Sequence, residues 1–188
     1  MEGKGYHSVY YLKFDHHGHL LVGTEKGLNI LDTATETVTW LYRKQNLADT
    51  SQKNYVWGID VDKHGKIWIA SRGGYAWSYD QYDKTFTDYD LNNGLNCNVI
   101  REIYVDTLGM VWMQTSYDGV YKYDPANNKL IQYGIEQGLG ALYPGQGRWS
   151  IINNKIYAGY ENVFSIIDPY QKHDEYYSLH PRNNCNEP

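Results

Sequence analysis

VDTLGMVWMQTSYDGVYKYD, residues 105–124, is the stretch that decides the fold, because the chain repeats it with variations. Two other copies are FDHHGHLLVGTEKGLNILD (14–32) and VDKHGKIWIASRGGYAWSYD (61–80), and a worn fourth copy is NKIYAGYENVFSIID (154–168). The aspartates that close the copies are Asp32, Asp80, Asp124 and Asp168, at steps of 48, 44 and 44 residues. Self-similarity at a period of about 20 to 50 residues is typical of solenoids and propellers.

Each unit is expected to form four short strands separated by turns, the pattern of a propeller blade. In the first unit the strands are predicted at 9–15, 20–24, 27–32 and 38–43. An Asp-x-x-Gly turn between the first two strands recurs at Asp15–Gly18, Asp62–Gly65 and Asp106–Gly109, where the Gly supplies a positive φ. The large apolar residue after this turn is Leu21, Trp68, Trp112 and Tyr157 in the four units. We therefore expect Trp68 and Trp112 to be buried between adjacent blades.

The sequence thus predicts an all-β fold, a β-propeller segment of about four four-stranded blades. The repeats are expected to occupy residues 1–181, with blades at about 6–43, 55–90, 98–134 and 147–179 and a polar tail at 182–188 where a further blade would begin. Four such units can close into a compact four-bladed ring, or form an open arc in which the outward faces of the first and last blades are bare. We expect those faces to pack against remaining propeller blades or to mediate self-association, because terminal repeats need capping.

Composition and charge exclude several classes of function. The 188 residues are 41 % hydrophobic and carry a formal net charge of -5, which argues against a nucleic-acid-binding protein. No run of about 18 apolar residues predicts a membrane segment, and the start, MEGKGYHSVYYLKF, lacks the apolar core of a signal peptide. The 20 Tyr and 6 Trp suit half-wet sheet surfaces and sugar-facing grooves.

The second and third units resemble the two-component regulator propeller repeat, with a consensus of V-x-x-I-x-x-D-x-x-G-x-h-W-h-x-T. The matching residues are Val56, Ile59, Asp62, Gly65, Trp68 and Ser71, then Ile100, Ile103, Asp106, Gly109, Trp112 and Thr115. The resemblance implies an arc of a seven-bladed propeller in the periplasmic or extracellular sensor region of a hybrid two-component histidine kinase. Many such sensors respond to oligosaccharides. Any kinase activity would then lie outside this chain.

Catalysis and metal binding are not favoured by the pattern. The repeated aspartates are marked as structural by their repetition, and among the acids near the inner strands only Asp60 and Glu102 break the repeat. The cluster His16-His17-Gly18-His19 is expected to be a solvated turn, because adjacent residues rarely converge on one ion. We therefore predict a protein without enzymatic activity, metal or cofactor, with a polysaccharide-active enzyme as the less favoured alternative.

Recognition on a repeated scaffold is expected where residues differ between blades, at the mouths of the inner strands. Aromatic rings there can stack on a sugar ring, and Arg or Glu can bind its hydroxyl and carboxylate groups. The candidate ligand-binding residues are Tyr10, Tyr55, Trp57, Arg101, Glu102, Tyr104, Arg148 and Trp149. The alternative is that these rings fill the wedge between blades, in a structural or protein-interaction propeller that binds no small ligand.

Overall fold

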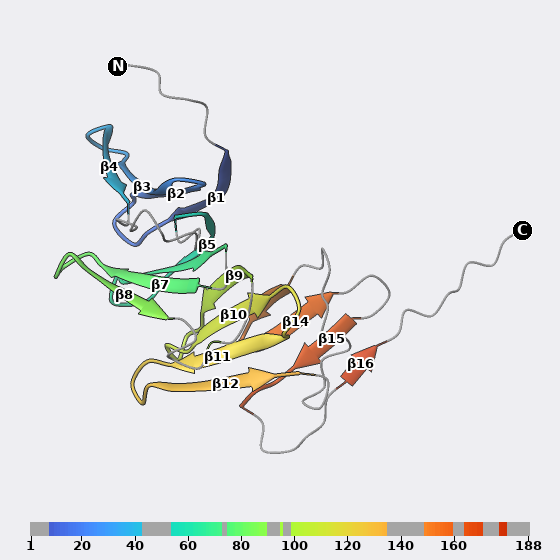
Figure 1. The fold of residues 1–188 in the computed structure, drawn as a ribbon. Helices are drawn as coiled ribbons and strands as arrows, with labels where there is room; N and C mark the ends of the chain where they lie inside the picture. Colours follow the sequence, from blue (N-terminus) through green and yellow to red (C-terminus); the bar gives the residue numbers. More distant parts are fainter. Residues whose placement is uncertain are drawn as a thin grey trace, which may run out of the picture.

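The chain folds into successive antiparallel sheets arranged as an open arc, as Figure 1 shows. The computed structural model describes residues 8–42, 54–72, 75–89, 95, 99–134, 149–159, 164–170 and 177–179. All regular elements in these ranges are β-strands. A helix long and apolar enough to cross a membrane does not occur in them. The polar tail predicted at 182–188 lies outside the described residues.

Four four-stranded sheets, which we call the first to fourth blades, follow one another along the chain. The first blade contains β1 (Val9–Phe14), β2 (Leu20–Thr24), β3 (Gly27–Asp32) and β4 (Thr37–Leu41). The second contains β5 (Val56–Val61), β6 (Ile67–Ser71), β7 (Tyr75–Asp80) and β8 (Thr85–Tyr89). The third contains β9 (Ile100–Val105), β10 (Val111–Thr115), β11 (Val120–Asp124) and β12 (Lys129–Tyr133). The fourth contains β13 (Trp149–Ile152), β14 (Lys155–Gly159), β15 (Phe164–Ile167) and β16 (Tyr177–Leu179).

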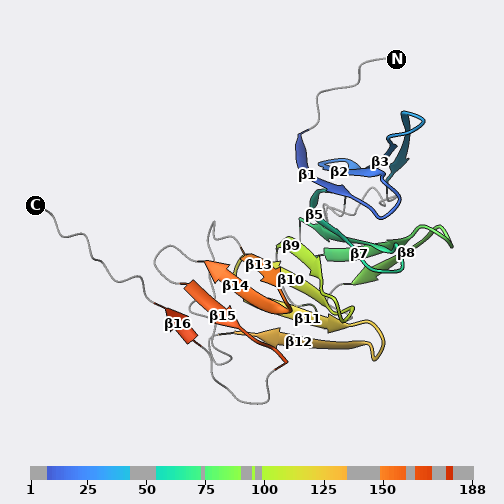
Figure 2. The same ribbon diagram turned by 180° about the vertical axis from the view of Figure 1, so that it is seen from behind.

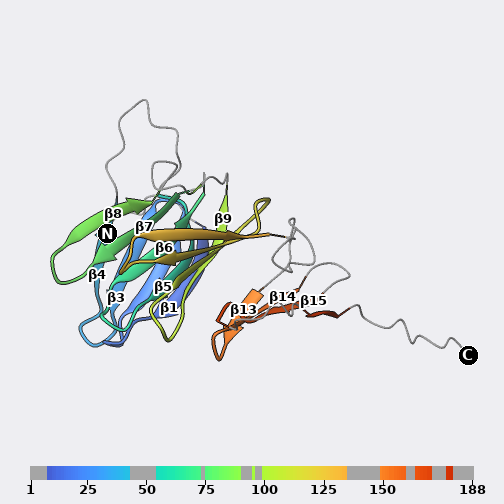
Figure 3. The ribbon, with the colours of Figure 1, turned by 90° about the horizontal axis from the view of Figure 1, so that it is seen from below.

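The predicted fold class is confirmed, including the open arc. Within each blade the strands pair in chain order as an antiparallel meander, and in the first blade each strand begins and ends within two residues of its predicted limits. The first and fourth blades lie at opposite ends of the arrangement in Figures 1 and 2, so the ring does not close. Figure 3 shows the same order from below, with the fourth blade turned away from the other three.

The repeated Asp-x-x-Gly turn has the structural role that its repetition predicted. Asp62 accepts two backbone N–H groups through Oδ1, at 2.9 and 3.0 Å, and the indole N–H of Trp68 through Oδ2, at 3.2 Å. Asp106 binds Trp112 in the same way, at 2.8 Å. The turn glycines Gly18, Gly65 and Gly109 have φ of +83°, +82° and +84°, a conformation that only Gly adopts without strain. One aspartate therefore fixes both the hairpin and the large residue that follows it.

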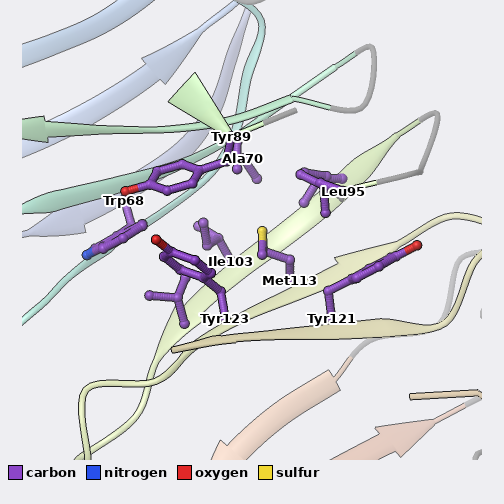
Figure 4. Packing of buried hydrophobic residues seen from close by; sticks show 11 residues of the cluster. Trp68, Ala70, Tyr89, Leu95, Ile103, Met113, Tyr121 and Tyr123 are labelled. Atoms are coloured by element: carbon purple, nitrogen blue, oxygen red, sulfur yellow. The ribbon is translucent and has the colours of Figure 1, made fainter. Parts of the chain in front are cut away.

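Interlocking aromatic side chains fill the space between adjacent blades. Figure 4 shows the cluster between the second and third blades, where Trp68 stacks on Tyr89 with ring centroids 5.3 Å apart. Burial raises the pKa of Tyr89 to about 12, so its hydroxyl stays neutral in this core. Trp112 occupies the equivalent position between the third and fourth blades. Trp68 and Trp112 are only 2 % and 1 % exposed, which confirms that both indoles are buried.

Burial along equivalent strands shows which faces the arc leaves uncovered. In the second blade β6 is buried throughout, because neighbouring blades cover both of its faces. In the first blade β1 alternates: Tyr11 packs towards the second blade, whereas Leu12 and Phe14 are 58 % and 62 % exposed. The strand registers place further apolar residues on that bare side. We call it the outer face, made of Leu12, Phe14, Leu20, Val22, Leu31, Val38 and Trp40.

Candidate ligand-binding site

Three of the predicted site residues lie at β-bulges that recur at one position in successive blades. The register between the first two strands skips Tyr10 in the first blade, Trp57 in the second and Arg101 in the third. A bulge leaves one residue unpaired and redirects its side chain, and bulges are common beside functional sites. Because β1 lies next to β5 and β5 next to β9, the three redirected side chains converge at one mouth of the arc.

The convergent side chains form a compact group of rings and guanidinium groups. The ring of Tyr10 lies 6.5 Å from that of Trp57 and 5.7 Å from that of Tyr55, which directly precedes β5. The guanidinium carbon of Arg101 lies 5.4 Å from the ring centroid of Trp57. The guanidinium carbon of Arg72, the residue directly after β6, lies 5.8 Å from the ring centroid of Trp57 and 5.5 Å from that of Tyr55. We call these five residues the bulge cluster.

Side chains from the ends of the second strands hold the bulge cluster in place. Ser116, which is buried, accepts a hydrogen bond of 2.8 Å from Nε of Arg101. Glu25 accepts one of 3.2 Å from the hydroxyl of Tyr55. Desolvation raises the pKa of Tyr55, as do its hydrogen bond with Tyr10 and the nearby Glu25 carboxylate. The Tyr55 hydroxyl is therefore a neutral donor at physiological pH.

One polar group in the cluster has no partner. Among the described residues, the indole N–H of Trp57 is the buried side-chain group that finds no hydrogen-bond acceptor. Such a group costs about 1 to 3 kcal/mol relative to a satisfied one. Buried polar groups without a partner are rare in native proteins, and a bound molecule at this position can supply the missing acceptor.

The remaining predicted site residues lie elsewhere. Tyr104 donates its hydroxyl to the carbonyl of Ile151, at 3.2 Å, and Trp149 is 8 % exposed in the core between the third and fourth blades. The Glu102 charge acts on the hydroxyl of Tyr11, whose pKa is raised by burial and then by this carboxylate. Arg148 lies outside the described residues. Tyr104 and Trp149 thus occupy the wedge between blades rather than the bulge cluster.

Sequence reasoning missed Arg72, although its signal was present. Glu25, Arg72 and Ser116 each follow the Thr or Ser that closes the second strand of a blade, at steps of 47 and 44 residues. These three residues occupy the same position in successive blades but differ in type from blade to blade. The same criterion selected Tyr10, Trp57 and Arg101. Applying it to the second strands as well as to the first would have found all three.

The acids and histidines weighed for chemistry have structural partners. Asp60 is 5 % exposed, and its carboxylate contacts Nζ of Lys13 at 2.9 Å and accepts the backbone N–H groups of Val61 and Val105, at 2.9 and 2.7 Å. His19 pairs with Asp15 at 2.9 Å, next to its own turn. Within the described ranges, no group of three or more His, Cys, Asp or Glu residues is placed to hold a metal ion.

The closing aspartates are also unsuited to acid catalysis. Asp32, Asp80 and Asp124 each accept two backbone N–H groups from the turn that follows. These bonds hold the pKa of Asp32 and Asp80 below the usual value, and for Asp124 the amide of Asn127 contributes first. A carboxyl group that stays ionised at neutral pH cannot donate a proton there.

Among comparisons with known proteins, those with solved structures are informative, and they concern the fold. No protein-family model matches the chain, and no curated protein matches it in sequence. The extracellular domain of BT4673 from B. thetaiotaomicron, assigned to a hybrid two-component system, superposes with a TM-score of 0.75 at 20 % identity over 95 % of this chain and 24 % of that one. The corresponding domain of BT3049 gives 0.70 at 22 % identity, over 93 % of this chain and 23 % of that one.

A likeness in fold extends to an enzyme as well. Virginiamycin B lyase from Staphylococcus aureus superposes with a TM-score of 0.71 at 10 % identity, over 94 % of this chain and 56 % of that one. The chain therefore spans about a quarter of the length of the two extracellular domains and about half that of the lyase. What these comparisons establish is that the chain has the fold of a β-propeller segment.

Proposed function

We propose that this chain is a ligand-sensing propeller segment of a two-component sensor, periplasmic or extracellular, that recognises an oligosaccharide through the bulge cluster. The observation that carries the proposal is the convergence of blade-specific side chains from three blades on one mouth of the arc. Two of the structurally similar proteins are extracellular domains assigned to such systems. Phosphotransfer would then belong to other parts of the sensor, and the role of this chain is binding.

The rings suited to contact a sugar are those of Tyr10 and Tyr55. Tyr10 is 43 % exposed, and its ring stands beside that of Tyr55 at the rim of the cluster. The ring of Trp57 supports the two arginines rather than the sugar, because the guanidinium groups of Arg72 and Arg101 both lie over it. Aromatic faces stack on the apolar face of a pyranose, while neighbouring donors satisfy its hydroxyl groups.

Thermal unfolding in the presence of an oligosaccharide panel tests this function. A ligand at about 100 times its Kd should stabilise the folded chain by about 2.7 kcal/mol. Tyr10→Ala should abolish that stabilisation. The matched control is Tyr82→Ala, since Tyr82 lies on a turn and is 92 % exposed. A chain that no oligosaccharide stabilises would support the alternative, a structural or protein-interaction propeller.

We also propose that a further propeller blade of the same sensor covers the outer face of the first blade. The repeat itself supports this, because the residues of the second blade that correspond to Leu12, Phe14 and Leu20 are Ile59, Val61 and Ile67, and the first blade buries all three. The outer face therefore has the apolar character of a surface that packs on another blade.

The chain alone should associate through its bare faces when no further blade is supplied. The double substitution Phe14→Glu with Trp40→Glu places charge on the outer face and should shift the chain towards monomer in sedimentation velocity. Tyr82→Glu adds a charge on a turn and should leave association unchanged. A wild-type chain that sediments as a monomer at all concentrations would contradict the proposal that this face requires a cover.

A further inference from the structure

The five residues of the bulge cluster carry more hydrogen-bond donors than acceptors, and the carboxylate of Glu25 beside them accepts from the hydroxyl of Tyr55. The donors of the cluster include two guanidinium groups, from Arg72 and Arg101, and the unpartnered N–H of Trp57. Among the residues that the structure describes, neither arginine forms a salt bridge. Yet both guanidinium groups lie over one indole, Arg72 at 5.8 Å and Arg101 at 5.4 Å from the centroid.

Each of these two cation–π contacts is favourable by itself, but the indole ring satisfies none of the N–H donors of either guanidinium group. An anionic group within reach of both arginines would accept charge-assisted hydrogen bonds from them. The chain as a whole carries a net charge of -5, so the arrangement is local and does not reflect a generally basic surface.

The orientation of Arg101 is fixed for such a contact. Its Nε donates to Oγ of the buried Ser116, at 2.8 Å, which sets the plane of the guanidinium group. The terminal nitrogens then have no protein acceptor in the described part of the chain. Arg72 is anchored through its backbone, whose N–H donates to the carbonyl of Tyr55 at 3.1 Å. A guanidinium group oriented in this way matches the paired oxygens of a carboxylate or a sulfate.

We propose that the ligand of the bulge cluster is an acidic saccharide, in which Arg72 and Arg101 bind a carboxylate or sulfate group while Tyr10 and Tyr55 contact the sugar ring. This inference rests on the proposed function and adds the chemical class of the ligand. A neutral oligosaccharide would leave both guanidinium groups without a charged partner. An acidic one supplies the acceptors that the cluster lacks.

Calorimetric titration of the full chain with three oligosaccharides of equal length tests the inference. The probes are a neutral gluco-oligosaccharide, an oligogalacturonate and a sulfated galacto-oligosaccharide. An acidic probe should bind at least tenfold more tightly than the neutral probe, and added salt should weaken it. Whichever of the two acidic probes binds more tightly identifies the anionic group as a carboxylate or a sulfate.

Variants separate the arginines from general electrostatics. Arg101→Gln and Arg72→Gln should each weaken the acidic probe at least tenfold and weaken the neutral probe much less, because a neutral hydroxyl group forms only an ordinary hydrogen bond with either arginine. Arg101→Lys keeps the charge but loses the paired donors, so it should restore only part of the affinity. Lys129→Gln removes a positive charge from an exposed position on β12 and should change nothing.

The outcomes distinguish the inference from the proposed function. If the neutral probe binds as tightly as the acidic ones and the arginine variants have no effect, the acidic-saccharide inference is overturned while the sensing function stands. If none of the three probes binds, both are overturned. Equal loss of affinity in Lys129→Gln and Arg101→Gln would also overturn the inference, because it would assign the attraction to overall charge.

Discussion

Replacing Trp112 with alanine should lower the free energy of unfolding by about 3 to 5 kcal/mol, the usual cost of emptying a large buried site. The indole is 1 % exposed and joins the third blade to the fourth, where it packs near Tyr133 with ring centroids 5.6 Å apart. It also donates its N–H to Asp106 at 2.8 Å, so the substitution removes both a core side chain and a turn contact. Urea denaturation followed by circular dichroism measures the loss.

Two control variants separate these contributions. Trp40→Ala removes an indole of the same size from the outer face, where it is 57 % exposed, and should cost far less. Trp112→Phe keeps most of the apolar volume but deletes the donor to Asp106, so it should cost about 1 to 3 kcal/mol. If Trp112→Ala proved no more destabilising than Trp40→Ala, the packing role of this column between the blades would be wrong.

The fold was predictable because each blade repeats the same short-range hydrogen bonds between residues at fixed spacings. The Asp-x-x-Gly turns, the Thr or Ser that closes the second strand and the indole N–H of the Trp form hydrogen bonds within one blade. Thr115, for example, donates its hydroxyl to the carbonyl of Gly119 at 2.9 Å across the next turn. Local contacts of this kind leave a direct signature in sequence spacing, so four blades follow from counting, whereas the open arc was expected from the resemblance to a seven-bladed family.

The binding site was only partly predictable because side-chain direction depends on the bulges. In a regular strand successive side chains point to opposite faces, so position alone would assign each residue a side. The bulges at Trp57 and Arg101 each shift the alternation of side chains along their strand by one residue. The positions of these bulges were not identified from the sequence. Tyr104, which lies three residues after the bulge at Arg101, packs in the wedge between the third and fourth blades and donates its hydroxyl to the carbonyl of Ile151.

Asp60 shows the complementary case, a residue that sequence reasoning singled out correctly but whose role only the structure explains. It breaks the repeat, which made it a candidate for chemistry. In the structure its carboxylate joins three blades: it pairs with Lys13 of β1, caps Val61 of its own strand and accepts the N–H of Val105 in β9. Burial lowers the pKa of Lys13, but the hydrogen bond and charge of Asp60 outweigh it and the net pKa is raised.

Asp60→Asn should therefore destabilise the chain by about 1 to 3 kcal/mol, the usual cost of leaving a buried donor without its acceptor, because the Lys13 side chain is 39 % exposed and can turn to water. The amide has nearly the same shape, but its NH₂ group must face Lys13 or a backbone N–H, all of which are donors. Asp83→Asn, on an exposed turn, is the matched control and should change stability little. Equilibrium denaturation of the two variants at the same pH gives the comparison.

A double-mutant cycle with Lys13→Met assigns the effect to the pair. Lys13→Met alone leaves a buried carboxylate with only its two backbone donors, so it should also destabilise the chain. In the double variant neither charge remains, and the combined loss should fall short of the sum of the single losses by about 0.5 to 3 kcal/mol. Additive losses would show that the pair is not coupled. An Asp60→Asn variant as stable as the wild type would mean that this carboxylate does not hold the three blades together, and would return it to the candidates for chemistry.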